Sequence, residues 1–301
     1  MSYCGRFAPS PTGRLHFGSL VAAVASYADA LAHAGRWLLR IEDVDRTREA
    51  PGAADEILRT LEDFGFEWSV EVVCQSRRTE HYEEALARLR TAGATYPCAC
   101  SRSAIAAIGR MGDEGPIYPG TCRRGIPPGT RERSIRVTTD DTPVTLRDAV
   151  YGPVTQRIES EVGDFVVKRA DGCFAYQLAV VVDDAEQGVT DVVRGADLLR
   201  STPRQIHLQR LLDLPTPRYA HAPLVLGPDG HKLSKQDRAH PMERSAPLPA
   251  LQAAWSFLAQ TGTGEAATPA EFWRLAAVAW DLSRVPALPL PVSGWQARPP
   301  P

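Results

Sequence analysis

Apolar positions in the first hundred residues alternate between short continuous runs and helical spacing. A run at Tyr3–Ala8 ends in Pro9-Ser10-Pro11-Thr12-Gly13, and such Pro/Gly clusters mark turns. The continuous apolar run Trp37–Ile41 is typical of a strand buried on both faces of a parallel sheet. Helical spacing of apolar residues predicts helices at 19–34, 53–64 and 80–91. This rhythm predicts an α/β fold, a doubly wound parallel sheet of the Rossmann type.

The rhythm breaks near residue 96 and returns near residue 164. The interrupting segment is rich in Gly and Pro and contains the strand-like run Ser134–Thr139. Later strands are expected at 164–168, 176–182, 189–194 and 219–226, and later helices at 202–212, 251–260 and 269–282. The expected domains are a first half of the sheet domain (1–95), an insertion (96–160), a second half (161–240), a small helical region (241–285) and a loose proline-rich tail (286–301).

The composition excludes several classes of protein. The chain has 34 Lys+Arg, 36 Asp+Glu and 44 % hydrophobic residues, which excludes intrinsic disorder of the whole chain and a generic nucleic-acid coat protein. The apolar stretch Leu20–Ala32 is interrupted by Ser26, Tyr27 and Asp29, so it is too short and too polar to span a membrane. No export signal is recognisable. We expect a cytoplasmic protein, and nothing in the sequence demands more than a monomer.

The loop between the first strand and the first helix contains a candidate phosphate site. His16, Gly18 and Ser19 stand where the helix begins. The free N–H groups and positive dipole end of a helix N-terminus favour anions, and glycine lets a backbone approach a ligand closely. The alternative is an ordinary turn with a surface histidine.

A second candidate phosphate site lies in the loop after the last expected strand of the sheet. Only three lysines occur among the 34 basic residues, and two of them stand in Lys232-Leu233-Ser234-Lys235-Gln236. Two ammonium groups three residues apart can bracket a polyphosphate as compact point charges. The alternative is a solvated basic turn.

The insertion contains a candidate metal site. Cys98, Cys100 and Cys122 lie within 25 positions, and Tyr118 precedes the last of them by four. Three thiolates and one further donor can form a closed tetrahedral zinc site. The alternative is three thiols without metal.

Charged and aromatic residues gather at expected strand ends. Glu42 follows the strand that ends at Ile41 and can hold an ammonium group, while Arg6 and Arg194 can clamp carboxylates bidentately. Tyr176 begins the run 176–182, which is interpreted as a core strand. Ligands of doubly wound sheets bind at the carboxyl ends of strands. The alternative for each residue is a polar rim of the core.

These motifs together resemble a known family. The chain contains Arg6-Phe-Ala-Pro-Ser-Pro-Thr-Gly, Arg40-Ile-Glu-Asp-Val-Asp, Val193-Arg-Gly-Ala-Asp and Thr202-Pro-Arg-Gln-Ile, besides the His16-x-Gly-x and Lys-Leu-Ser-Lys loops. In this order they resemble the glutamyl branch of the class I aminoacyl-tRNA synthetases, over residues 3 to 240.

The resemblance implies a set of roles. A glutamate pocket is implied at Arg6, Phe7, Ala8, Pro9, Ser10, Glu42, Tyr176 and Arg194. An ATP site is implied at Pro9, Ser10, His16, Gly18, Ser19, Lys232, Leu233, Ser234, Lys235 and Gln236. Of these, His16, Lys232 and Lys235 are the implied catalytic residues. One structural Zn²⁺ is implied at Cys98, Cys100, Tyr118 and Cys122, and Mg²⁺ is implied with the ATP.

The resemblance departs from the full-length enzymes of this branch after Gln236. Those enzymes carry a large anticodon-reading region, whereas 65 residues follow Gln236 here. The chain is therefore more similar to shortened paralogues that activate glutamate without tRNA and attach it to the queuosine base at the wobble position of tRNA(Asp). A minimal enzyme charging the 3′ end of tRNA(Glu) is the main alternative. A small-molecule nucleotidyltransferase and a catalytically idle RNA-binding relative are further alternatives.

Overall fold

Parallel strands form the centre of the computed structural model, which describes residues 2–227, 242–288 and 290–291. β1 (Cys4–Phe7), β2 (Arg36–Ile41) and β3 (Val73–Cys74) pair in parallel, and so do β11 (Asp191–Gly195) and β12 (Arg218–Ala222). The N–H of Thr190, just before β11, donates to the carbonyl of Cys4 in β1 at 2.9 Å. The expected strands at 3–8, 37–41 and 189–194 are thereby confirmed, and the strand expected at 219–226 is divided into β12 and β13 (Val225–Leu226).

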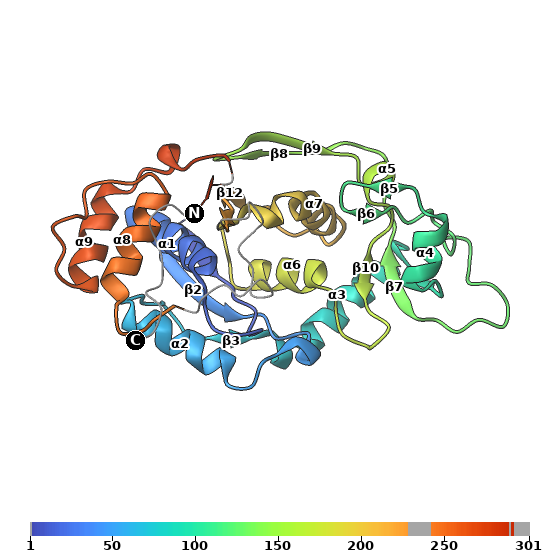
Figure 1. The fold of residues 1–301 in the computed structure, drawn as a ribbon. Helices are drawn as coiled ribbons and strands as arrows, with labels where there is room; N and C mark the ends of the chain where they lie inside the picture. Colours follow the sequence, from blue (N-terminus) through green and yellow to red (C-terminus); the bar gives the residue numbers. More distant parts are fainter. Residues whose placement is uncertain (1, 228–241, 289, 292–301) are drawn as a thin grey trace.

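Helices cover these strands as shown in Figure 1. They are α1 (Phe17–Ala32), α2 (Ala53–Asp63), α3 (Thr79–Thr91), α6 (Tyr176–Glu186) and α7 (Thr202–Leu211). α1 is the central one, and eleven of its sixteen residues are buried. It ends before Gly35, where a Cβ would lie only 2.6 Å from Cδ1 of Tyr3. The helices expected at 19–34, 53–64, 80–91 and 202–212 are confirmed.

α6 corrects the strand expected at 176–182. Three consecutive β-branched valines, Val180–Val182, favour a strand. However, α6 is buried along Leu178–Asp184, so a continuous apolar run is compatible with a buried helix as well as with a strand. Helical spacing places Asp183 and Asp184 two turns after Tyr176, where both carboxylates meet cationic partners.

A second, antiparallel sheet lies on the opposite side of the molecule from α8 and α9 (Figure 1). Its order is β10 (Val166–Lys168), β7 (Ser134–Val137) and β4 (Thr95–Cys98). The strand expected at 164–168 therefore does not extend the parallel sheet but pairs with the strand expected at 134–139. The same region contains α4 (Arg102–Ile108), β5 (Met111–Gly112), β6 (Gly115–Pro116) and α5 (Ile158–Glu161), and the hairpin β8 (Val144–Asp148) with β9 (Gly152–Gln156) connects it to β12.

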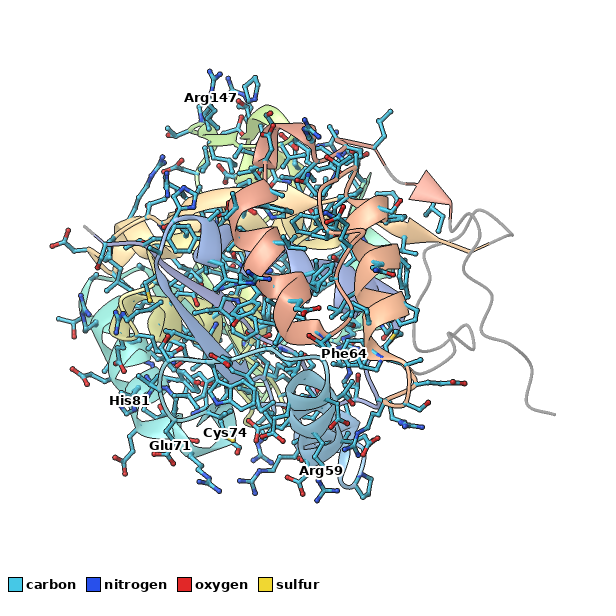
Figure 2. All side chains as sticks on the ribbon, turned by 90° about the vertical axis from the view of Figure 1, so that its left-hand side faces the viewer. Arg59, Phe64, Glu71, Cys74, His81 and Arg147 are labelled. Carbon is cyan, nitrogen blue, oxygen red and sulfur yellow. The ribbon has the colours of Figure 1, made fainter. Side chains whose placement is uncertain are left out.

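α8 (Pro247–Phe257) and α9 (Pro269–Ala279) pack against α1. Figure 2 views the molecule from their side and shows them in front of the N-terminal strands. Two indole N–H groups connect α9 to its neighbours: Trp273 donates to the carbonyl of Phe64 at the end of α2, and Trp280, which follows α9, donates to Asp29 of α1, each at 2.9 Å. The helices expected at 251–260 and 269–282 are thus confirmed. β14 (Leu290–Pro291) pairs with β13, so this part of the segment expected to be loose is a strand.

None of the helices within residues 2–227 and 242–288 combines the length and the apolar character that crossing a membrane requires.

Candidate functional site

A cavity of about 670 Å³ lies at the carboxyl ends of β1, β2, β11 and β12. Eleven residues singled out in the sequence line it, namely Arg6, Phe7, Ala8, Pro9, Ser10, His16, Gly18, Ser19, Glu42, Tyr176 and Arg194. Segments far apart in the chain supply them, because the parallel strands end at one edge of the sheet. The structure therefore brings the candidate glutamate residues and the candidate phosphate loop into one site.

Arg6, which lines the cavity, is held in place by a carboxylate of α6. Its Nε and Nη2 donate to Asp184 at 3.2 and 3.4 Å, and Arg40 donates to the same carboxylate at 2.7 Å. Burial would raise the pKa of Asp184, but the two guanidinium groups outweigh it and lower that pKa. Arg6 keeps further N–H groups for a ligand, since a guanidinium has five.

Glu42 is a buried carboxylate with an unsatisfied oxygen. Its side chain is 8 % exposed, and Oε1 lies 3.5 Å from Nη2 of Arg40 but accepts no hydrogen bond from the described residues. Burial raises the pKa of Glu42 to about 7, against the opposing effect of Arg40 and Arg6. A buried acceptor without a donor is costly. Its position fits a ligand that brings a cationic donor.

Arg194 contributes a second buried guanidinium group to the cavity. Its Nη2 donates to Thr202 at 2.9 Å and to Gln205 at 2.8 Å, and its Nη1 lies 3.4 Å from the phenol oxygen of Tyr176. Burial raises the pKa of Tyr176 to about 12, so its hydroxyl keeps its proton and can donate. Arg194 and Tyr176 together can bind one carboxylate.

His16 caps α1 at the opposite part of the cavity. Its Nδ1 accepts from the N–H of Ser19 at 3.3 Å, in the N-cap position. A Cβ on residue 18 would lie 3.2 Å from Cε1 of His16, so Gly18 leaves room for this ring. The start of the helix therefore opens into the cavity, which suits a phosphate.

The lysine loop Lys232, Leu233, Ser234, Lys235 and Gln236 lies outside the described residues. Its assignment to ATP stays a prediction.

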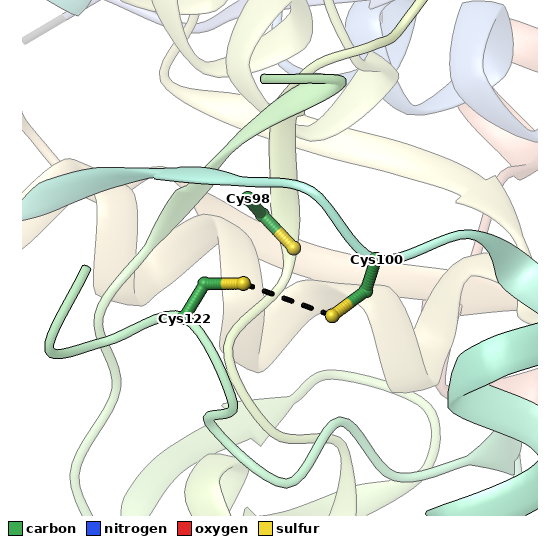
Figure 3. A group of neighbouring side chains, drawn as sticks. All are labelled: Cys98, Cys100 and Cys122. Carbon is green, nitrogen blue, oxygen red and sulfur yellow. Dashed lines mark hydrogen bonds between the residues drawn. The ribbon is translucent and has the colours of Figure 1, made fainter. Parts of the chain in front are cut away.

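The cysteines of the insertion form a compact cluster. Sγ atoms of Cys98, Cys100 and Cys122 lie within 4.8 Å of one another, and Figure 3 shows them pointing toward a common centre. The phenol oxygen of Tyr118 lies 3.4 Å from Sγ of Cys98 and 3.9 Å from Sγ of Cys100. The four side chains expected as ligands are therefore neighbours.

The chemistry of this cluster fits a metal ion. Burial raises the pKa of Cys98, but hydrogen bonds with Tyr118 and Arg136 more than offset it, and the pKa falls to about 7. Nε of Arg136 lies 3.3 Å from that sulfur, and its guanidinium stacks on the Tyr118 ring at 3.8 Å. Thiolates are the ligands of metal-bound cysteine. The cluster can hold one metal ion.

Several residues around the cavity have no counterpart among those expected from the sequence. Arg40 and Asp184 form the ionic floor under Arg6 and Glu42. Asp148 and His221 lie behind Arg194. A signal existed for Asp184, because it stands eight residues after Tyr176 and shares a helix face with it. His221 lies between two alanines in β12, and the sequence offers no comparable pattern for it.

Comparison with known proteins agrees with this arrangement. Residues 4–246 match the family model described as class I tRNA synthetases (E and Q), catalytic domain. A glutamyl-Q tRNA(Asp) synthetase of Aromatoleum aromaticum is 54 % identical over 94 % of this chain and 90 % of its own. One of Neisseria meningitidis is 51 % identical over 94 % of this chain and 97 % of its own.

Solved structures support the same fold. A glutamate tRNA ligase of Elizabethkingia meningosepticum, in complex with its amino acid, superposes with a TM-score of 0.81 at 23 % identity, covering 97 % of this chain and 67 % of that one. A glutamate–tRNA synthetase of Elizabethkingia anophelis gives 0.82 at 23 % identity, covering 98 % and 68 %. The α/β catalytic fold of class I tRNA synthetases is thus confirmed, and the chain belongs to the glutamyl-Q tRNA(Asp) synthetase family.

Proposed function

We propose that this protein is a ligase that activates L-glutamate with ATP, without tRNA, and then transfers the glutamate to the queuosine base at the wobble position of tRNA(Asp). The relatives that share more than half of its residues carry the corresponding name. Its partners are accordingly L-glutamate, ATP with Mg²⁺, and tRNA(Asp) bearing queuosine.

The observation that carries the proposal is the charge pattern of the cavity. An unsatisfied carboxylate oxygen of Glu42 lies in the same cavity as two buried guanidinium groups, Arg6 and Arg194. Glutamate carries one ammonium group and two carboxylates, so Glu42 can pair with its ammonium group and Arg6 and Arg194 with its carboxylates. An amino acid with an uncharged side chain has one carboxylate fewer, so one of the two guanidinium groups would have no carboxylate of the ligand to bind.

The roles of the remaining residues follow from their chemistry. Phe7, Ala8, Pro9 and Ser10 border the glutamate and continue toward the ATP, and the N–H of Glu42 donates to the carbonyl of Pro9 at 3.0 Å. His16, Gly18 and Ser19 present the start of α1 to the phosphates. Lys232 and Lys235, with Leu233, Ser234 and Gln236, complete the ATP site in the proposal.

Activation requires little covalent chemistry from the protein. An oxygen of the glutamate α-carboxylate attacks the α-phosphorus of ATP, the bond to the bridging oxygen breaks, and pyrophosphate leaves. The pocket aligns the carboxylate with the phosphorus, while His16, the helix start and Lys235 stabilise the charge that moves onto the phosphates. Mg²⁺, bound mostly through phosphate oxygens, neutralises charge on the ATP.

Transfer of labelled glutamate to three RNAs tests the acceptor. We expect label, in the presence of ATP, on tRNA(Asp) that contains queuosine, and none on the same tRNA without queuosine or on tRNA(Glu). Nuclease cleavage between the anticodon arm and the 3′ end, followed by separation of the fragments, distinguishes the two attachment sites. Label on the 3′ end of tRNA(Glu) contradicts the transfer step and identifies a minimal charging enzyme.

For the cysteine cluster we infer one structural Zn²⁺ held by Cys98, Cys100, Cys122 and Tyr118. Three sulfur ligands favour zinc over magnesium or calcium, and a closed four-ligand set is typical of structural sites. Two of the cysteines are fully buried, and the cluster lies among the elements of the insertion. The ion holds these elements together, away from the cavity.

Metal analysis checks this assignment. We expect about one zinc per chain in the purified protein, and loss of the ion in Cys98→Ser together with a lower melting temperature, because binding of a structural ion contributes to folding. Cys173→Ser is the matched control, since Cys173 is a half-buried thiol outside the cluster. A metal-free chain with unchanged stability contradicts the inference.

A further inference from the structure

Behind Arg194, on the side away from the cavity, lies a buried chain of hydrogen bonds. Nδ1 of His221 lies 2.6 Å from Oδ2 of Asp148, and Nε of Arg194 lies 3.1 Å from Nε2 of His221. Asp148 and His221 are 1 % and 0 % exposed, so water does not compete for these bonds. Neither residue lines the cavity.

The order of donors in this chain is fixed by the chemistry of its members. A guanidinium can only donate, so Nε2 of His221 accepts from Arg194. Nδ1 therefore carries the ring proton and donates to the Asp148 carboxylate, which can only accept. Burial lowers the pKa of His221, although the bond to Asp148 opposes the shift, and this agrees with a neutral ring.

Asp148 is itself oriented by the backbone. Its Oδ1 accepts from the N–H groups of Val150 at 3.0 Å and Tyr151 at 2.9 Å, at the turn of the β8–β9 hairpin. This arrangement determines which carboxylate oxygen faces His221. The hairpin thereby controls the tautomer of a histidine 73 residues away in sequence.

We propose that Asp148 and His221 are positioning residues that orient Arg194 toward a carboxylate of the substrate. Nε of Arg194 is held by His221 and Nη2 by Thr202 and Gln205. Nη1, beside Tyr176, is left as the group that faces the cavity. The plane of the guanidinium is thus set from β8, β12 and α7 together. This inference rests on the proposed binding of glutamate by Arg194.

Asp148→Asn tests the arrangement with almost no change in shape. The amide oxygen of the substituted side chain has to remain on the two backbone N–H groups, so its NH₂ group faces Nδ1 of His221. The ring then accepts at Nδ1 and carries its proton on Nε2, where it meets the N–H of Arg194. Two donors face each other, and the positioning of Arg194 is lost. An analogous change of tautomer follows an Asp-to-Asn substitution in serine proteases.

The expected effect is specific for glutamate. In glutamate-dependent ATP–pyrophosphate exchange, Asp148→Asn raises the KM for glutamate by about 10- to 100-fold, the effect of losing a hydrogen bond that orients a charged group. The KM for ATP changes by less than about 3-fold, because a change in a hydrogen bond outside the proposed ATP site has only a small effect on ATP binding. His221→Gln, whose amide oxygen can accept from Arg194, retains most of the glutamate affinity, whereas His221→Leu does not.

The matched control is Asp164→Asn. Asp164 is likewise a fully buried carboxylate that accepts a backbone N–H, from Thr139, but it pairs with Arg123 in the insertion and does not line the cavity. A loss of stability without a change in the KM for glutamate is expected there. If Asp148 has a purely structural role, both variants lose stability and neither changes the KM for glutamate. That result contradicts the proposal.

The tautomer gives a readout that does not depend on any ligand. In protein labelled with ¹⁵N-histidine, the signal of His221, identified by its absence in His221→Gln, should show a neutral ring protonated at Nδ1. In Asp148→Asn the proton should move to Nε2. An Nε2-protonated ring in the unmodified protein overturns the inference. Absence of glutamate-dependent exchange in the unmodified protein instead overturns the proposed function, and with it the role of Arg194.

Discussion

Alanine in place of Lys235 lowers glutamate-dependent ATP–pyrophosphate exchange on the order of 10²- to 10³-fold, the effect of removing one preorganised charge that stabilises a transition state. The ammonium group of Lys235 is proposed to stabilise charge on the phosphates as pyrophosphate leaves. The exchange assay follows glutamate activation alone, so the result does not depend on which RNA is the acceptor. Near-normal exchange contradicts the proposed role.

The chain provides a matched control for this substitution. Lys168 is the third of its three lysines, and it forms an exposed ion pair with Glu83 at 2.5 Å and lies over the ring of Phe174. Exposed ion pairs contribute about 1 kcal/mol at most, and Lys168 does not line the cavity. Lys168→Ala should therefore exchange pyrophosphate normally, with a melting temperature similar to that of Lys235→Ala.

Most elements of the fold are predictable because their patterns are local. The helix from Phe17 follows a Pro/Gly turn and ends just before a glycine, and the strand up to Ile41 is a short apolar run. The helix from Tyr176 cannot be predicted from its local pattern, because a buried helix and a buried strand have the same continuous apolar pattern. The partner of β10 is equally unpredictable, since strand pairing is a long-range property that its three residues do not encode.

The residues of the candidate site likewise include some that the sequence predicts and some that it does not. Residues proposed to meet a ligand, such as Arg6 and Arg194, stand in motifs at strand ends and are visible in the sequence. Residues that hold them, such as Asp184 and His221, contact their partners over 178 and 27 positions. The spacing from Tyr176 gives a signal for Asp184, but no spacing indicates the contact of His221 with Arg194, which the fold alone brings together.

Glutamine in place of Glu42 should weaken glutamate binding while it stabilises the protein. The variant keeps the shape of the side chain but removes the charge that is proposed to pair with the substrate ammonium. Loss of one partner of a buried charge pair is worth on the order of 10²- to 10³-fold in kcat/KM for glutamate. Steady-state pyrophosphate exchange with varied glutamate measures this effect.

The sign of the stability effect follows from the pKa. That of Glu42 is about 7 in the folded protein and 4.5 ordinarily, so the fold disfavours the ionised form. The cost is absent below pH 4.5, grows as the pH rises and is complete above about pH 7. Glu42→Gln avoids it, and its free energy of unfolding at pH 8 should exceed that of the unmodified protein by about 1 to 3 kcal/mol. Denaturant unfolding at pH 4 and pH 8 should show a difference at pH 8 only.

The same titration predicts how glutamate binding depends on pH. In the proposed binding mode the ammonium group of the substrate pairs with the ionised form of Glu42, so the KM for glutamate should rise as the pH falls below about 7. This rise should be absent in Glu42→Gln. Glu83→Gln is the control, because Glu83 is a half-exposed carboxylate paired with Lys168 outside the cavity. If Glu42→Gln stabilises the protein and weakens glutamate binding, the carboxylate is retained for binding although it lowers the stability of the fold. A Glu42→Gln variant that is destabilised at pH 8 would show that the carboxylate serves the fold instead.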